Sequence, residues 1–207
     1  VLRLGTRYEF VDTFITAGAN TIDLEASKGL NIFGASDEGD ANMTRSEGDP
    51  QFSKLELEIQ RLQRITGSVN LLLAGRGQWA SNALLSSEEF SVGGINSGRG
   101  YDPSEISGDH GVSGKVELQW KEPVALDKSF VESYQLFGFY DIGRVWNEDA
   151  TTSSQKIDSL SSVGAGLRFD LPQEFDAGFA VAFPLTREPT TANDHDPKFY
   201  LNVSKRF

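Results

Sequence analysis

Two segments of the sequence carry residues whose types could form a buried, charge-assisted contact. The first is a glycine-rich stretch, residues 93–101, in which Arg99 is the only cation. The second is the stretch 139–143, Phe-Tyr-Asp-Ile-Gly, in which Asp141 is the only acid. A guanidinium and a carboxylate form a short, bidentate pair where little water is present. We therefore expect these residues to pin one segment of the chain to another, and we predict no catalytic residue.

Other polar groups have only part of the pattern that a catalytic or nucleotide site needs. The glycines before Arg99 are spaced as in a phosphate loop, but Arg99-Gly100 replaces Lys-Ser/Thr and no strand-to-helix pattern surrounds it. Asp109-His110 has no serine at the spacing of a catalytic triad. Several carboxylates share a strand face with cations, and we interpret them as cross-strand ion pairs instead of the paired acids of a hydrolase. The acids are Asp23, Glu25, Glu56 and Glu58, and the cations are Arg3, Arg7, Lys54 and Arg76.

Composition limits the cofactors and partners. The chain has no cysteine, which excludes Cys-ligated zinc, iron–sulfur clusters and thiol catalysis. His195 lies between two aspartates on a polar segment, and we interpret it as part of a solvated cluster, so no metal or other cofactor is predicted. The net charge of −11 argues against nucleic acid as a partner.

The elements that must position these residues are predicted to be β-strands. Apolar and polar residues alternate with period 2 in nearly every segment, and the charges fall on one face. A half-buried sheet needs this pattern, because a slip of one residue would turn every apolar side chain to the other face. Nine strands are predicted, near residues 2–10, 22–27, 54–59, 69–78, 115–120, 135–142, 163–170, 177–183 and 199–206.

The connections between the predicted strands alternate in length. Those at 17–20, 66–67, 123–132 and 172–174 are short or moderate, and those at 34–51, 82–111, 147–159 and 187–197 are long. One end of the sheet therefore carries tight turns and the other carries long polar loops, which is the layout of outer-membrane barrels. No apolar run approaches the ~18 residues of a membrane helix. The sequence thus predicts an all-β transmembrane antiparallel barrel.

Nine is an odd number of strands, whereas a barrel closed by one bacterial chain has an even number. We therefore expect residues 1–207 to be the C-terminal part of one barrel domain, with the N-terminal strands outside this sequence. No signal peptide opens the chain, so we expect that it was cleaved or lies outside. Loop 82–111 is dense in glycine, which permits positive φ, and we expect it to fold back as a compact hairpin.

The same motifs carry a resemblance to a known superfamily. Ser97-Gly98-Arg99-Gly100-Tyr101 resembles the Val-Arg-Gly-Tyr/Phe signature of outer-membrane transporters and barrel-assembly proteins. The Phe-x-Asp-x-Gly stretch at 139–143 and Phe207 match two further marks of that superfamily. Within it, the stretches 106–111 and 139–146 are most similar to two-partner secretion transporters of the haemolysin secretion/activation type. The similarity is dense from about residue 90 to 207 and thin before that.

The resemblance implies a fold, a function and partners. The fold is a 16-stranded barrel preceded by two periplasmic domains, in which these nine strands are the eighth to the sixteenth and loop 82–111 is the sixth extracellular loop, folded into the lumen. The function is export of a large exoprotein across the bacterial outer membrane, with no bond made or broken. The partners are the exoprotein, outer-membrane lipid and the outer-membrane assembly machinery.

The resemblance also implies roles for particular residues. Arg99 and Asp141 form a lock that holds the loop in the pore. The loop motif comprises Gly94, Gly98, Gly100 and Tyr101, the strand motif Phe139 and Gly143, and the assembly signal Leu201, Val203 and Phe207.

One departure and two alternatives remain. Gly98 stands where the family usually has Val, so we expect looser docking of the loop and a steadier one in Gly98→Val. A barrel-assembly insertase shares the Arg-Gly-Tyr and Phe-x-Asp-x-Gly marks. A soluble, acidic β-sandwich binding domain explains the alternation of the strands equally well.

Overall fold

Eleven strands make up the regular structure of the described residues. The computed structural model describes residues 1–32, 34, 40, 43–124, 130–148, 156–191 and 194–206. The strands are β1 (Leu2–Asp12), β2 (Gly18–Lys28), β3 (Ser53–Arg64), β4 (Val69–Ala80), β5 (Phe90–Val92), β6 (Ile106–Gly108), β7 (His110–Pro123), β8 (Ser133–Trp146), β9 (Ile157–Leu171), β10 (Phe175–Pro184) and β11 (Lys198–Lys205). No helix among the described residues is long and apolar enough to cross a membrane.

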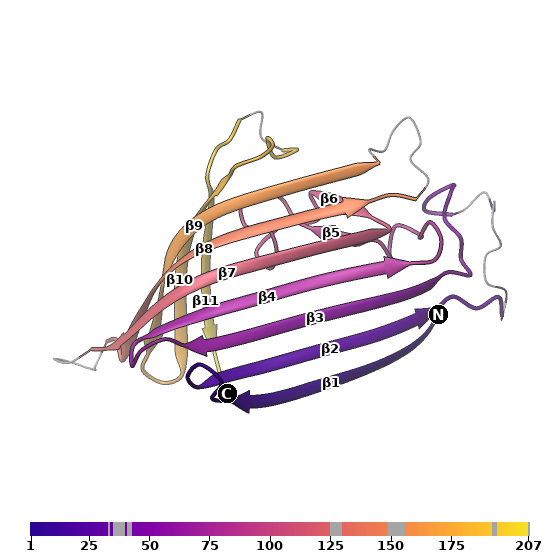
Figure 1. Cartoon of the computed structure of the whole chain (residues 1–207). Helices are drawn as coiled ribbons and strands as arrows, with labels where there is room; N and C mark the ends of the chain where they lie inside the picture. Colours follow the sequence, from indigo (N-terminus) through magenta and orange to yellow (C-terminus); the bar gives the residue numbers. More distant parts are fainter. Residues whose placement is uncertain are drawn as a thin grey trace.

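Nine of these strands form one antiparallel sheet in the order β1-β2-β3-β4-β7-β8-β9-β10-β11. Each strand of the sheet pairs with its neighbour along the chain, apart from the excursion through β5 and β6. The all-β, nine-stranded prediction is therefore confirmed, and the described strands do not form the two facing sheets of a sandwich. Figure 1 shows the sheet strongly curved, with β10 and β11 turning behind the front strands.

Long and short connections separate at the two ends of the strands, as predicted. The strand ends that the long β2–β3 and β8–β9 connections join lie at the right of Figure 1, and the short β3–β4 turn lies at the left. The strand bounds correct several loop bounds, because β2 already begins at Gly18, β9 begins at Ile157 and β10 ends at Pro184. His110 is the first residue of β7, so the long connection spans 81–109. We call this segment, which contains β5 and β6, the hairpin loop.

The two faces of the sheet differ as the alternation predicted. Apolar side chains point to the convex face, where Leu118 is 54% and Leu57 43% exposed. Charged side chains point to the concave face, where Glu117 is 2% and Asp141 1% exposed. These acids are buried because the hairpin loop covers part of the concave face (Figure 1).

The main apolar core lies between the hairpin loop and the sheet. Its members come from β5, β6 and the loop tip on one side and from β8 and β9 on the other, namely Phe90, Val92, Tyr101, Ile106, Val145 and Leu160. A second cluster joins Phe137 and Phe139 of β8 to Ala180 and Ala182 of β10. The expected fold-back of the long loop is therefore present, and its apolar contacts hold it against one half of the sheet.

Candidate functional site

The tip of the hairpin loop is joined to β8 by a buried ion pair. Arg99 Nε donates to Asp141 Oδ2 at 2.9 Å, and Nη2 donates to Oδ1 at 2.8 Å. The backbone N–H of Arg99 adds a third bond to Asp141 Oδ2, at 3.0 Å. Only 7% of the arginine side chain and 1% of the aspartate side chain are exposed. The structure thus brings together the two residues whose pairing the sequence predicted.

Two further charges extend this contact across the concave face. Arg99 Nη1 donates to Glu117 Oε2 at 2.6 Å, and Arg168 Nη1 donates to Glu117 Oε1 at 2.7 Å. We call Arg99, Glu117, Asp141 and Arg168 the inner cluster. Its two cations and two anions alternate, so each of the three buried charges, Arg99, Glu117 and Asp141, has an opposite charge beside it, as burial in a place of low dielectric requires, and the more exposed Arg168 completes the series.

Sequence reasoning placed Glu117 and Arg168 on the polar face but did not predict their part in the cluster. A signal was available for Glu117, because β7 and β8 pair Lys115 with Asp141 and Glu117 with Phe139. This register places Glu117 two positions along from Asp141 on the same face, within reach of a long side chain. Arg168 could not be found in this way, since it lies on β9, across β8 from Glu117.

Aromatic rings form the floor under both arginines. The guanidinium carbon of Arg99 lies 3.4 Å from the ring centre of Phe139, and that of Arg168 lies 3.7 Å from the ring centre of Phe137. The two rings stack, with centres 6.2 Å apart. Cation–π contacts of this kind strengthen when water is excluded. Phe139 of the strand motif therefore supports the lock residue directly.

The next two residues of the loop motif attach the tip to β9 and β10. The Tyr101 hydroxyl donates to the carbonyl of Ser161 at 3.0 Å and accepts from the backbone N–H of Leu185 at 3.2 Å. A Cβ at Gly100 would lie 2.7 Å from the backbone nitrogen of Pro184, so a side chain there would collide with β10. Gly100 is thus required by close packing and Tyr101 by its hydrogen bonds.

Gly98 corrects one sequence-based expectation. Its φ is +86°, and an added Cβ would lie 2.7 Å from Leu160 Cδ1. Because a β-branched residue is strained at positive φ, valine at this position would disturb the tip. The expected looser docking is also not what the structure has, since Arg99 makes all of the bonds described above. The positive φ and the short distance to Leu160 therefore argue against the expectation that Gly98→Val steadies the loop.

Two more motif glycines lie where the hairpin loop bends or approaches the sheet. Gly143 faces β5, and a Cβ there would lie 2.6 Å from Val92 Cγ1. Gly94 has a φ of +80° and lies beside Pro103. Within five residues, the strand motif therefore supplies the carboxylate of Asp141, the ring of Phe139 under Arg99, and space at Gly143 into which Val92 of the hairpin loop fits.

The residues of the expected assembly signal lie apart from this site. Leu201 and Val203 point outward from β11 and are 79% and 65% exposed. Phe207 lies outside the described residues. Their role stays a prediction.

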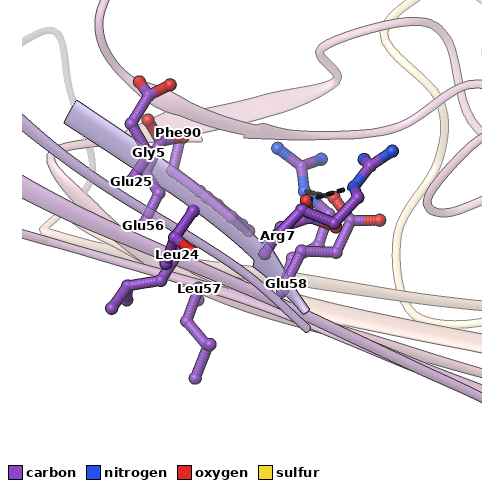
Figure 2. Close-up of a pocket in the computed structure, with 12 residues that line it drawn as sticks. Gly5, Arg7, Leu24, Glu25, Glu56, Leu57, Glu58 and Phe90 are labelled. Carbon is purple, nitrogen blue, oxygen red and sulfur yellow. Dashed lines mark hydrogen bonds and ion pairs between the residues drawn. The ribbon is translucent and has the colours of Figure 1, made fainter. Parts of the chain in front are cut away.

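The other half of the concave face carries the predicted cross-strand ion pairs. Arg7 lies 2.6 Å from Asp23, and Arg76 lies 3.7 Å from Glu58. Arg3 pairs with Glu25 across strands, whereas Lys54 pairs with Glu56 of its own strand and with Glu88 of the hairpin loop. Several of these residues, among them Arg7, Glu58 and Arg76, line an open pocket of about 400 Å³, which Figure 2 shows in close-up. The three arginines remain well exposed, in agreement with the interpretation as cross-strand ion pairs, whereas the Lys54 side chain is buried.

Comparisons with known proteins agree with this geometry. The family model described as haemolysin secretion/activation protein ShlB/FhaC/HecB matches residues 4–169. The outer membrane transporter CdiB of Dickeya dadantii is 26% identical over 179 residues, which cover 84% of the chain. The heme/hemopexin transporter protein HuxB of Haemophilus influenzae is 31% identical over 133 residues, which cover 63% of the chain.

The relatives are much longer than the chain. It spans 30% of the Dickeya protein and 23% of the Haemophilus protein. The solved structure of CdiB from Escherichia coli superposes with a TM-score of 0.74 at 24% identity, covering 97% of the chain and 36% of that structure. At this identity the superposition supports the fold alone, whereas the family match favours the secretion alternative over the barrel-assembly alternative.

Proposed function

The chain belongs to the haemolysin secretion/activation protein ShlB/FhaC/HecB family, and from this premise we propose that it is the C-terminal part of an outer-membrane barrel that exports a large exoprotein. Its nine strands would be the eighth to the sixteenth of a 16-stranded barrel. The remaining strands and the periplasmic domains would lie outside residues 1–207. The concave face would line the lumen, and the convex face, with its exposed apolar rows, would contact lipid.

The inner cluster is the observation that carries this proposal. A hairpin loop that is folded against the inner wall occupies space through which an exported chain would pass. Arg99 holds its tip in place by three bonds to Asp141 and a fourth to Glu117. A contact of this kind gives the pore a defined resting state without closing it permanently, because no covalent bond is involved.

The rest of the lumen wall suits passage of an extended polypeptide. Charged and polar side chains cover the β1–β4 half, where ion pairs such as Arg7 with Asp23 remain partly exposed. A wall of mixed charge offers an unfolded chain few apolar patches at which to stall. The exoprotein is the partner during export, and the assembly machinery would act on β11 during insertion of the barrel.

Secretion by the full-length transporter tests the proposal. Arg99→Ala and Asp141→Ala should each reduce export of the cognate exoprotein by similar amounts, and the double variant should be little worse than either one. Arg7→Ala is the matched control, because it removes an arginine from the open half of the same face. Folding is checked by heat-modifiable migration in gels. Export that is unchanged in folded Arg99→Ala and Asp141→Ala contradicts the role of the inner cluster.

A further inference from the structure

A second buried ion pair lies at the base of the hairpin loop, at the loop end of the sheet. Arg45, in the β2–β3 connection, donates from Nη1 to Asp109 Oδ1 at 2.5 Å and from Nη2 to Oδ2 at 3.2 Å. The Asp109 side chain is completely buried, and 12% of the Arg45 side chain is exposed. This pair is nearly as well buried as the Arg99–Asp141 pair, although the sequence analysis assigned Asp109 no partner.

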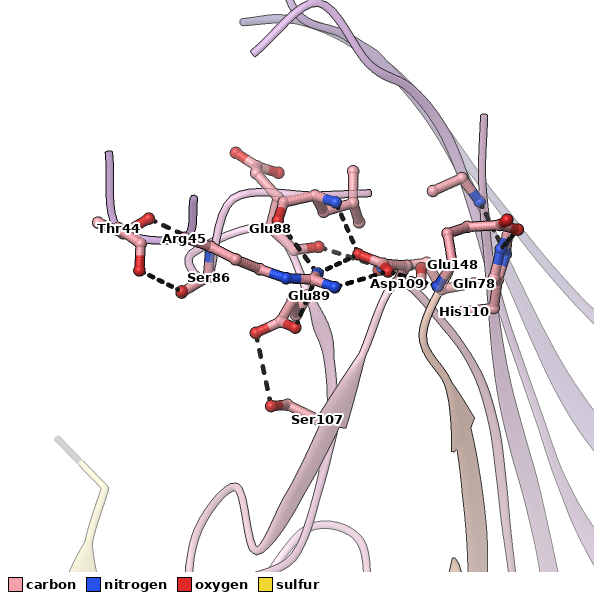
Figure 3. Close-up of polar contacts among 12 residues, drawn as sticks. Thr44, Arg45, Gln78, Ser86, Glu88, Glu89, Ser107, Asp109, His110 and Glu148 are labelled. Carbon is pink, nitrogen blue, oxygen red and sulfur yellow. Dashed lines mark hydrogen bonds and ion pairs between the residues drawn. The ribbon is translucent and has the colours of Figure 1, made fainter. Parts of the chain in front are cut away.

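Asp109 also binds two other segments through their backbones (Figure 3). The N–H of Leu84, at the start of the hairpin loop, donates to Oδ1 at 2.6 Å. The N–H of Glu148, in the β8–β9 connection, donates to Oδ2 at 2.9 Å. Three connections that are far apart in sequence therefore converge on one carboxylate, which sits between β6 and β7.

Arg45 makes further contacts to the same end of the hairpin loop. Its Nη1 lies 3.2 Å from Glu89 Oε1 and 3.3 Å from the carbonyl of Leu84. Beside it, the N–H of Asp49 donates to the carbonyl of Ala83 at 2.8 Å. Arg45 and Asp49 of the β2–β3 connection are thus both bonded to the hairpin loop.

The low exposure of Arg45 and Asp109 distinguishes their contact from an ordinary surface salt bridge. Exposed ion pairs contribute little because water screens them, but loss of one member of a buried pair leaves a charge that water does not solvate. The four charge-assisted bonds to Asp109 come from one guanidinium and two amides, so replacing Arg45 removes two of them and leaves the carboxylate buried. The Arg45–Asp109 contact shares no residue with the inner cluster.

We propose that Asp109 is a positioning residue that couples the β2–β3 connection to the hairpin loop, so that the two segments move together. The tip of the hairpin loop is held by Arg99 and its base by Asp109, and the base attachment is the one that includes the β2–β3 connection. Displacement of the hairpin loop then loosens the β2–β3 connection, and displacement of that connection loosens the hairpin loop. As a device that regulates export, this coupling rests on the function proposed above.

Hydrogen exchange of the full-length transporter in lipid nanodiscs tests the coupling directly. Arg45→Ala should speed exchange of the peptide that contains Leu84 and of the peptides covering 90–108 by about tenfold or more, since local opening of a buried charge-assisted contact is made easier. Arg64→Ala, an exposed arginine at the opposite end of β3, is the control and should leave these peptides unchanged. Faster exchange confined to residues 43–52 overturns the coupling.

A covalent rescue sharpens the test. The 207 residues contain no cysteine, and the Asp49–Ala83 backbone contact offers a place for a disulfide between Asp49→Cys and Ala83→Cys. In the Arg45→Ala background, oxidation should return the exchange of the hairpin loop to near the parent rate, and reduction should abolish this rescue. A formed disulfide that restores nothing overturns the proposal. Asp109→Asn should speed exchange of the hairpin loop as Arg45→Ala does. If Asp109→Asn fails to fold, the test rests on the Arg45 variants.

These measurements separate the coupling from export. Exchange is read without any exoprotein, so a transporter that shows the coupling and exports nothing contradicts only the proposed function. A transporter that exports normally while Arg45→Ala leaves the hairpin loop unchanged contradicts only the coupling.

Discussion

The concave face consists of two halves with the same alternation and different environments. On β1–β4, Arg7 and Asp23 pair with 65% and 31% of their side chains exposed. On the β7–β9 half, Arg99 of the hairpin loop pairs with Asp141 of β8, and 7% and 1% of their side chains are exposed. Arg7 and Asp23 pair across neighbouring strands, whereas Arg99 comes from the hairpin loop itself. The hairpin loop also reaches the first half, where its Glu88 binds Lys54, but it leaves Arg7 and Asp23 partly exposed. The same kind of ion pair is therefore part of a solvated surface in one half, and in the other half it holds the hairpin loop against the sheet.

Small residues allow the hairpin loop to pack closely against β8 and β10. Gly143 leaves room for Val92, and Gly100 leaves room for the backbone of β10. The aromatic floor under the arginines lies on β8 alone, at Phe137 and Phe139. The position of a charged residue in the sheet thus decides whether the hairpin loop shields it from water. The degree of burial then decides how much stability is lost when that residue is replaced.

The largest expected effect is the contrast between these two pairs. Asp141→Ala should lower the free energy of unfolding by about 3–5 kcal/mol, because Arg99 is left buried without its main partner. Asp23→Ala removes an exposed partner and should cost roughly 0–1 kcal/mol. Denaturant unfolding of the refolded full-length barrel in detergent measures both. Equal losses of stability in the two variants would show that burial under the hairpin loop does not decide how much each ion pair contributes.

The two faces of one strand provide the next contrast. Leu118→Arg, near the middle of β7 on the convex face, should cost about 2–4 kcal/mol if that face meets lipid. Gln119→Arg places the same side chain on the concave face and should cost far less, since polar side chains such as Gln135 surround it there instead of lipid. The same unfolding assay applies. A penalty that is the same for both positions would contradict the assignment of lipid and lumen faces.

A smaller effect is expected at the tip itself. Gly98→Val should cost about 1–2 kcal/mol, because the valine must adopt a left-handed backbone and its Cβ approaches Leu160. Channel recordings should then show more frequent fluctuations than in the parent. Ser97→Val, one residue earlier, is the control for added bulk. A quieter trace in Gly98→Val would restore the expectation that valine improves docking.

The contrast between the halves also marks what sequence could and could not predict. Period-2 alternation placed Asp141 and Glu117 on the inward face, and the glycines before Arg99 indicated a loop that folds back. The predicted strand count and faces are confirmed for this reason. The Arg45–Asp109 contact joins residues 64 positions apart through two irregular loops, where no periodicity relates one side chain to another. The sharing of Glu117 by two arginines likewise depends on the path of the hairpin loop.

The smallest expected effect concerns an ion pair at the edge of the cover. Asp102, in the hairpin loop, accepts from Lys198 Nζ at 2.6 Å and from the Thr191 hydroxyl. These hydrogen bonds, that of Lys198 first, lower the pKa of Asp102 below its ordinary value. A carboxyl with a lowered pKa stabilises the fold above its unfolded-state pKa of about 3.9, and this contribution disappears as the pH falls through the lowered folded-state value.

Lys198→Ala should therefore reduce stability slightly at neutral pH, by no more than about 1 kcal/mol because the pair is partly exposed. The difference between parent and variant should shrink as the pH is lowered below about 4. Unfolding midpoints of the full-length barrel at a series of pH values measure it, with Lys205→Ala at the other end of β11 as the control. A difference in stability that stays constant down to acid pH would show that Lys198 acts by packing instead of by its charge. Its ion pair with Asp102 would then not help to hold the hairpin loop.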